Sequence, residues 1–96
     1  MDLITFLLIV EALILSLALN LENLEVAFYT SGLSQFNESD FAAANLSALV
    51  YRRYQEILRH EQTHAALLAF VLSTNGANVP QPCNYTLYAS SLSTGF

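Results

Sequence analysis

Glu61 and His64 have the residue types and the spacing of metal ligands. Residues three apart in a helix lie on the same face, so this pair would direct a carboxylate and an imidazole at one point. In helical bundles, one glutamate from a neighbouring helix joins such a pair to form half of a dinuclear iron or manganese site. Glu22 lies in another segment with a helical pattern and could be this glutamate from the neighbouring helix. The spacing therefore predicts a metal site made from Glu22, Glu61 and His64.

The segment that contains Glu22 and the segment that contains Glu61 and His64 each place these residues on a largely apolar helical face. At about 100° per residue, each segment has one such stripe. The stripe of the later segment consists of Tyr54, Ile57, Glu61, His64, Leu68 and Val71. The stripe of the earlier segment consists of Glu11, Leu15, Ala18, Glu22, Val26, Tyr29 and Leu33, with Glu25 at its edge. A carboxylate buried among apolar groups is costly unless it is protonated, paired or bound to a cation, and a metal ion would remove that cost.

Structural roles remain open for several of these residues. His64 also fits a core histidine that is hydrogen-bonded to Glu22 or Tyr54. Tyr29 and Tyr54 fit core tyrosines as well as neighbours of the metal ligands. His60 lies on the flank of its stripe, beside the ligands or facing solvent. We predict no catalytic residue.

The elements that position these residues are two long helices. The first is expected over about 3–31, because nothing interrupts it before Gly32. A short helical connector capped by Ser39 leads to a second helix over about 46–74, which Asn75-Gly76 ends. Residues 1–76 would form an antiparallel helical hairpin, and 77–96 an irregular C-terminal arm. The predicted fold class is all-α.

The composition predicts an assembly of more than one chain. Hydrophobic residues make up 54% of the 96 positions and charged residues only 11%, more apolar surface than so short a chain hides easily. We expect a homodimer or homo-oligomer in which two hairpins rebuild a four-helix bundle around a two-fold axis. Two copies of the three ligands would give four carboxylates and two imidazoles, enough for a dinuclear site. The net charge of −5 argues against a nucleic-acid partner.

The apolar stretch over 3–19 has the composition of a signal sequence or a membrane span. Asp2 stands where a signal sequence carries basic residues, and Glu11 would be costly near the centre of a span. We therefore interpret the stretch as part of a bundle helix and expect no membrane partner. Cleavage after Ala18 remains an alternative, because Ser16-Leu17-Ala18 has the form of a cleavage site.

The cellular location is less constrained by the sequence. Asn-x-Ser/Thr sequons occur at Asn37, Asn45 and Asn84, all near predicted helix ends or in loops, and they are candidate glycosylation sites. They favour a secreted protein over a cytoplasmic one, although short Asn/Ser/Thr-rich loops also generate sequons by chance. Cys83 has no second cysteine in the chain to pair with.

A family resemblance covers roughly residues 14 to 86. The segments 14–29, 40–44, 60–64 and 81–85 resemble fungal and plant ferritin-like proteins of the desiccation- and stress-related group. The resemblance implies a four-helix bundle in which helices 1 and 3 each give a Glu and helices 2 and 4 each give Glu-x-x-His. Glu22 matches the helix 1 ligand, because a Tyr seven residues later, here Tyr29, accompanies it in the family; Glu25 is the reserve choice. The chain ends where helix 3 would begin, so it would supply half of the bundle.

Two functions are consistent with these observations. The first is a ferritin-like metal protein that binds Fe or Mn, dinuclear if the chain is dimeric, and that supports oxidase, catalase-like or storage chemistry. The second is a structural or interaction protein that keeps the scaffold without metal. Fold class does not choose between them.

Overall fold

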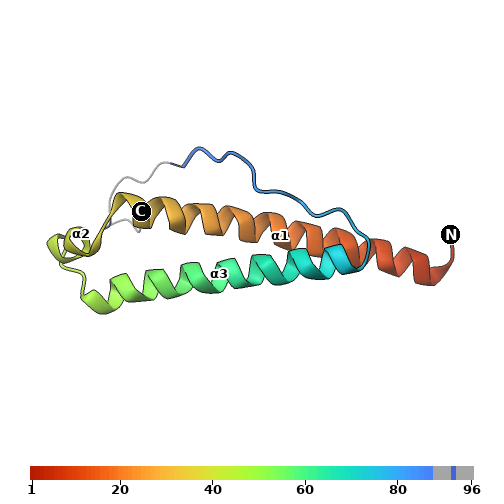
Figure 1. The fold of residues 1–96 in the computed structure, drawn as a ribbon, viewed down its shortest axis with the longest axis horizontal. Helices are drawn as coiled ribbons and strands as arrows, with labels where there is room; N and C mark the ends of the chain where they lie inside the picture. The colour runs from red at the N-terminus through yellow and green to blue at the C-terminus, as the bar shows by residue number, and fades with distance from the viewer. Residues whose placement is uncertain (88–91, 93–96) are drawn as a thin grey trace.

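The computed structural model describes residues 1–87 and 92, and these residues form an all-helical hairpin with a C-terminal arm (Figure 1). Its elements are α1 (Leu3–Gln35), α2 (Glu38–Ala43) and α3 (Ala48–Thr74). The long helices α1 and α3 lie side by side and run in opposite directions, and α2 joins them at one end. No strand occurs in the described part of the chain, so the all-α prediction is confirmed.

Each helix begins at a polar residue whose side chain accepts a backbone N–H. Asp2 Oδ1 accepts from Thr5 N at 2.7 Å, and Ser47 Oγ accepts from Val50 N at 3.4 Å. At α2, Asn37 and Asp40 form a reciprocal capping box with distances of 2.8 and 3.0 Å. The prediction of Ser39 as this cap was wrong. Asn37 takes the role because an acid three residues later can return the hydrogen bond to its backbone.

The ends of α2 and α3 share one geometry. Asn45 follows α2 with φ of 62° and Gly76 follows α3 with φ of 72°, both in the left-handed region. Beyond each, the next backbone N–H returns to the helix: Leu46 N donates to Phe41 O at 2.9 Å, and Ala77 N donates to Leu72 O at 3.0 Å. Such closures satisfy carbonyls that would otherwise lack partners. They turn the chain sharply after each helix.

The first helix is longer than its glycine predicted. α1 passes through Gly32 and ends at Gln35, where Phe36 adopts an extended conformation and its N–H donates to Gly32 O at 2.9 Å. A glycine ends a helix when it adopts the left-handed conformation, and Gly32 instead remains helical. The end of α1 is thus set by the extended residues that precede the first turn of α2.

The fully buried part of the described chain is small. Leu19, Phe41 and Leu72 are its buried hydrophobic residues, and Asn23 is a buried polar one. Phe41 anchors α2 on α3 through edge-on ring contacts with Tyr51 at 5.1 Å and Tyr54 at 5.5 Å between centroids. A single aromatic residue therefore fixes the connector that sets how α1 and α3 meet.

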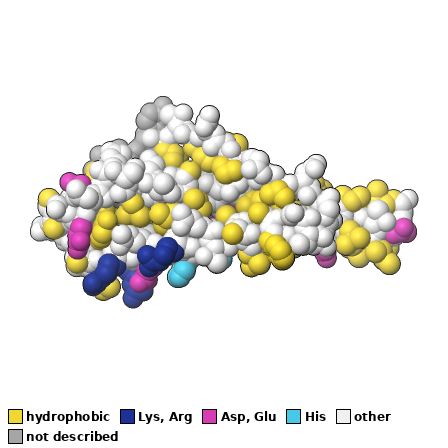
Figure 2. All heavy atoms as spheres, in the orientation of Figure 1, with side chains coloured by type: hydrophobic (Ala, Val, Ile, Leu, Met, Phe, Trp, Pro, Cys, Tyr) yellow, Lys and Arg dark blue, Asp and Glu magenta, His cyan; other side chains and the backbone are white. Residues whose placement is uncertain are grey.

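The N-terminal end of α1 projects beyond α3, and hydrophobic side chains cover this projection (Figure 2). By length and composition α1 could cross a membrane, with a mean hydropathy of 2.3 over its most apolar stretch, of which 6% is buried. The core helix of a larger assembly or a signal sequence has the same properties. The expectation that the chain has no membrane partner stays a prediction.

Candidate metal centre

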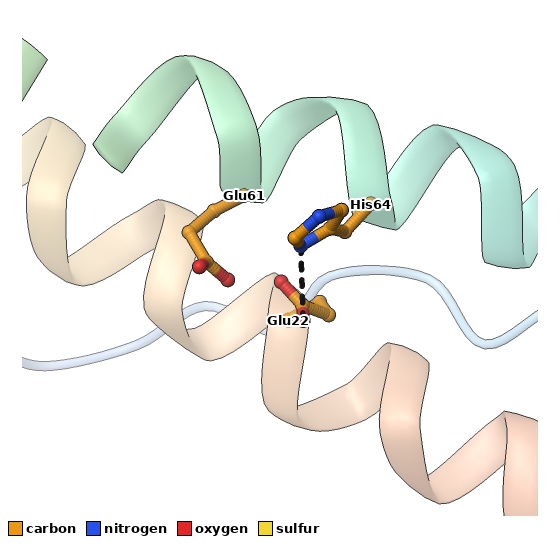
Figure 3. A group of neighbouring side chains, drawn as sticks. All are labelled: Glu22, Glu61 and His64. Carbon is orange, nitrogen blue, oxygen red and sulfur yellow. Dashed lines mark ion pairs between the residues drawn. The ribbon is translucent and has the colours of Figure 1, made fainter. Parts of the chain in front are cut away.

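Glu22 from α1 and the pair Glu61 and His64 from α3 meet in the space between the two helices (Figure 3). One ligand atom from each residue lies within 4.8 Å of the other two. His64 Nδ1 is 3.7 Å from Glu22 Oε1. Residues 39 positions apart in the sequence thus converge because α2 folds α3 back along α1. Two carboxylates and one imidazole at this separation can share a single cation.

The burial of the two carboxylates supports a cation at this position. Glu22 Oε2 and Glu61 Oε2 are both buried, and neither has a hydrogen-bond partner. A buried carboxylate oxygen without a partner is destabilising, because it has lost its hydration without gaining a donor. A metal ion bound between these oxygens would take the place of the missing donors, so the residues present fit a hard or intermediate divalent cation.

His64 is more exposed than its helical stripe predicted. Its side chain keeps 57% of its accessible surface, against 21% for that of Glu22, and Ile57 is also exposed. On α3 the contact with α1 is centred on the side of Tyr54 and Leu72, which places Ile57 and His64 roughly 60 to 80° away from its centre. The imidazole therefore closes the cluster from its open side.

Glu25 lies beside the cluster and is exposed. A hydrogen bond with the Glu61 carboxylate raises the pKa of Glu25, and burial and the charge of Glu61 add to this effect, whereas His64 opposes it. Two carboxylates that share a proton repel less than two charged ones. Glu25 thus interacts with Glu61 from outside the three-residue cluster, and the two carboxylates repel each other once both are charged.

Tyr29 and Tyr54 pack against each other next to these acids, with 5.9 Å between their ring centroids. Burial raises the pKa of the Tyr29 hydroxyl, and Tyr54, Glu25 and Glu61 raise it further. The remaining predicted neighbour, His60, is exposed on α3.

An open hollow of about 640 Å³ borders the acids on one side. Glu25, Tyr29 and Glu61 line it, together with apolar residues of α1 and Leu87 of the arm. The hollow gives small molecules a route to the carboxylates. Sequence reasoning missed this feature, because the arm has no periodic pattern from which its course along α1 could be predicted.

The candidate modification sites lie on the surface. Asn37, Asn45 and Asn84 are all exposed, although the Asn37 side chain is engaged as the cap of α2. Cys83 is an exposed free thiol in the arm. The part of the arm over 88–91 and 93–96 lies outside the described residues.

The two long helices run antiparallel and each contributes a glutamate, and a histidine follows one of these glutamates by three residues. This arrangement is typical of helical proteins with carboxylate-rich sites. A family comparison agrees with this class, since the model of the ferritin-like domain matches residues 11–95. The chain belongs to the ferritin-like domain family. A search of curated proteins gave no match to the chain. The family assignment supports a metal-binding helical bundle and leaves the metal and the biological role to be argued from the site.

Proposed function

We propose that this protein binds iron or manganese through Glu22, Glu61 and His64. The observation that carries the proposal is the pair of buried carboxylate oxygens, Glu22 Oε2 and Glu61 Oε2, that have no hydrogen-bond partner and lie beside an imidazole. A metal would neutralise both carboxylates and satisfy their oxygens at once. Glu25, the reserve ligand, lies next to Glu61 and could replace a lost carboxylate.

The ligand types favour iron or manganese over structural zinc. Zinc in structural sites is held by Cys and His in a closed tetrahedron, whereas carboxylates with few imidazoles suit Fe and Mn. Each chain offers one set of three ligands, so a dinuclear centre requires a second set. Bound in this way, the ions would supply redox cycling for oxidase, catalase-like or storage chemistry.

The residues around the cluster would control access and protons. Tyr29 packs on Tyr54 and lines the hollow together with Glu25 and Glu61, so small molecules would reach the carboxylates past this tyrosine. Because Glu61 raises the pKa of Glu25, Glu25 holds a proton more readily than an isolated glutamate.

The proposal is tested by metal content. We expect protein purified without chelator to contain Fe or Mn, and the Glu61→Ala/His64→Ala variant to lose it. Glu56→Ala/His60→Ala is the matched control, because it removes the same residue types from the same helix outside the cluster. Metal per chain is measured by inductively coupled plasma mass spectrometry, with circular dichroism to check helix content.

The alternative is a scaffold protein without metal. The 3.7 Å contact between Glu22 Oε1 and His64 Nδ1 favours it, since a protonated imidazole at this position would offset part of the charge. Equal metal content in the parent and the Glu61→Ala/His64→Ala variant would remove the proposed site, and a parent that contains neither Fe nor Mn would establish this alternative. A chelator should also leave the thermal midpoint of a scaffold protein unchanged and should lower that of a metal protein.

We further propose a stress-related, secreted role on the basis of the resemblance of segments 14–29 and 60–64 to the desiccation- and stress-related group. The exposed sequons at Asn37, Asn45 and Asn84 support secretion, because a glycan can be attached only to an accessible side chain. Expression in a eukaryotic secretory host, followed by enzymatic removal of N-glycans, should shift the electrophoretic mobility. No shift would remove this part of the proposal.

A further inference from the structure

One side of α1 carries a continuous apolar stripe, and the other described elements approach it only at its C-terminal end, where Leu24 and Phe28 border the hollow with Leu87. The residues of the stripe recur at alternating spacings of four and three, the heptad pattern of a helix that packs lengthwise on another helix. They are Leu3, Leu7, Val10, Ile14, Leu17, Leu21, Leu24 and Phe28. All are exposed except Val10, which is half-buried. We refer to these residues as the heptad stripe.

Two other sides of α1 have neighbours in this chain along the part of the helix that α3 and the arm cover. The side marked by Glu22 faces α3, and the side marked by Thr30 lines a cavity of about 570 Å³ with Pro82 and Tyr85 of the arm. At about 100° per residue, the heptad stripe is centred roughly 110° from Glu22 and nearly opposite Thr30. A helix in a four-helix bundle contacts two neighbours on adjacent sides, and the heptad stripe occupies the position of the second.

The accessible surface of the chain is larger than that of a compact monomer of the same mass, and the difference indicates how much surface a partner could cover. The chain exposes 6683 Å², whereas a compact monomer of 10.6 kDa exposes about 5,500 Å². The excess of about 1,200 Å² is larger than the roughly 800 Å² that each partner buries in a stable protein interface. A contact along the heptad stripe, which is about 38 Å long at 1.5 Å per residue, is long enough to bury an area of this size.

We propose that the heptad stripe is the contact surface of a homodimer, in which α1 of one copy packs against α1 of a second copy. The stripe contains no charged residue, so two copies meet without like charges in the seam. The proposal does not depend on metal binding. It adds to the proposed function because it brings two sets of Glu22, Glu61 and His64 into one particle.

A lipid bilayer is the other environment that could receive an apolar helix. The observations favour a second copy, because lipid requires no heptad spacing, whereas the eight stripe positions keep it without a break from Leu3 to Phe28. Glu11 would also lie in the hydrocarbon region of a membrane-inserted α1, where a carboxylate is costly. In the dimer Glu11 lies outside the seam, on the side of α1 that borders Val71 and Leu72 of α3.

The test compares the solution mass of the parent with that of two lysine variants. By sedimentation equilibrium at micromolar concentration, we expect the parent to have twice the chain mass. Leu21→Lys, at the sixth of the eight stripe positions, should raise the dimer dissociation constant at least 100-fold. Phe70→Lys is the matched control: Phe70 is 65% exposed and Leu21 53% exposed, but Phe70 lies on α3 away from the stripe. Its dissociation constant should change less than threefold.

Several outcomes would overturn the proposal. A helical parent at single-chain mass does so alone, as does a Leu21→Lys variant that remains dimeric or a Phe70→Lys variant that loses the dimer. Binding of the parent as a monomer to phosphatidylcholine vesicles would assign the stripe to lipid. Should Leu21→Lys be unfolded by circular dichroism, Leu21→Asn and Phe70→Asn replace the lysine pair. The dissociation constant should then rise only for Leu21→Asn, and an unchanged value overturns the proposal.

The failure of this proposal is distinguishable from failure of the proposed function. The Glu61→Ala/His64→Ala variant should lose metal and remain a dimer, because neither residue belongs to the heptad stripe. A dimer without metal refutes only the metal site. A monomer that binds metal refutes only the interface.

Discussion

Replacing Phe41 with alanine should remove most of the stability of the fold. Phe41 has no exposed surface, and its ring contacts Tyr51 and Tyr54. Truncation of a buried Phe costs about 3–5 kcal/mol, and loss of the two ring contacts places this site at the upper end, near 4–5 kcal/mol. A domain of this length has roughly 5–14 kcal/mol in total, and the small buried core places this one near the lower limit. The variant should therefore be close to unfolded.

The assay is urea unfolding followed by far-ultraviolet circular dichroism at a fixed protein concentration. With a slope of about 1 kcal/mol per molar urea, the midpoint of Phe41→Ala should fall by about 4 M, or the transition should disappear. Phe70→Ala makes the same chemical change at an exposed position and should alter the free energy of unfolding by less than about 0.5 kcal/mol. A loss below about 1 kcal/mol for Phe41→Ala would refute the inference that this ring fixes α2 on α3.

Two further predictions concern local features. Hydrogen bonding to Glu61 raises the pKa of Glu25 in the fold above its ordinary value of 4.5, so this contact stabilises the metal-free protein at low pH and its contribution is lost as the pH rises through the folded pKa. Glu25→Gln should therefore be more stable than the parent at pH 7 and no more stable below pH 4, as measured by thermal melts in chelator. An unchanged difference in stability across this pH range would contradict the shared proton. Asn37→Ala removes the capping box of α2 and should lower the free energy of unfolding by about 1 kcal/mol, whereas Asn20→Ala on the exposed side of α1 should change it little, so that equal effects of the two substitutions would show that the cap is not used.

The helical class was predictable because its signals are local. Long runs without a breaker and the Asn75-Gly76 stop are properties of neighbouring residues, and the helices follow them. Which helix face turns inward was predictable only in part. Glu22 and Glu61 are half-buried as their stripes indicate, but His64 is exposed, because the contact face depends on the partner helix as well as on the period of α3.

The details that sequence reasoning missed are those set by contacts between segments. The cap at Asn37 depends on Asp40, and the continuation of α1 through Gly32 depends on the extended conformation of Phe36. The hydrogen bond between Glu25 and Glu61 links residues on separate helices, whose relative rotation no single-helix period can give. The course of the arm along α1 is likewise a tertiary property.

The position of the acids on both long helices gives any bound metal a mechanical role. Glu22 belongs to α1 and Glu61 to α3, and the chain connects the two helices only through α2. An ion bound by both Glu22 and Glu61 would link the two ends of a 39-residue stretch of chain. It would bind the folded protein, in which α1 and α3 are packed together, far better than the unfolded chain. At a free concentration of about 100 times its dissociation constant, such an ion adds about 2.7 kcal/mol to the folded state, a large share of the stability of so small a core. The supply of metal around the protein would then set the fraction of chains that stay folded, and the thermal midpoint should rise with each tenfold increase in iron or manganese.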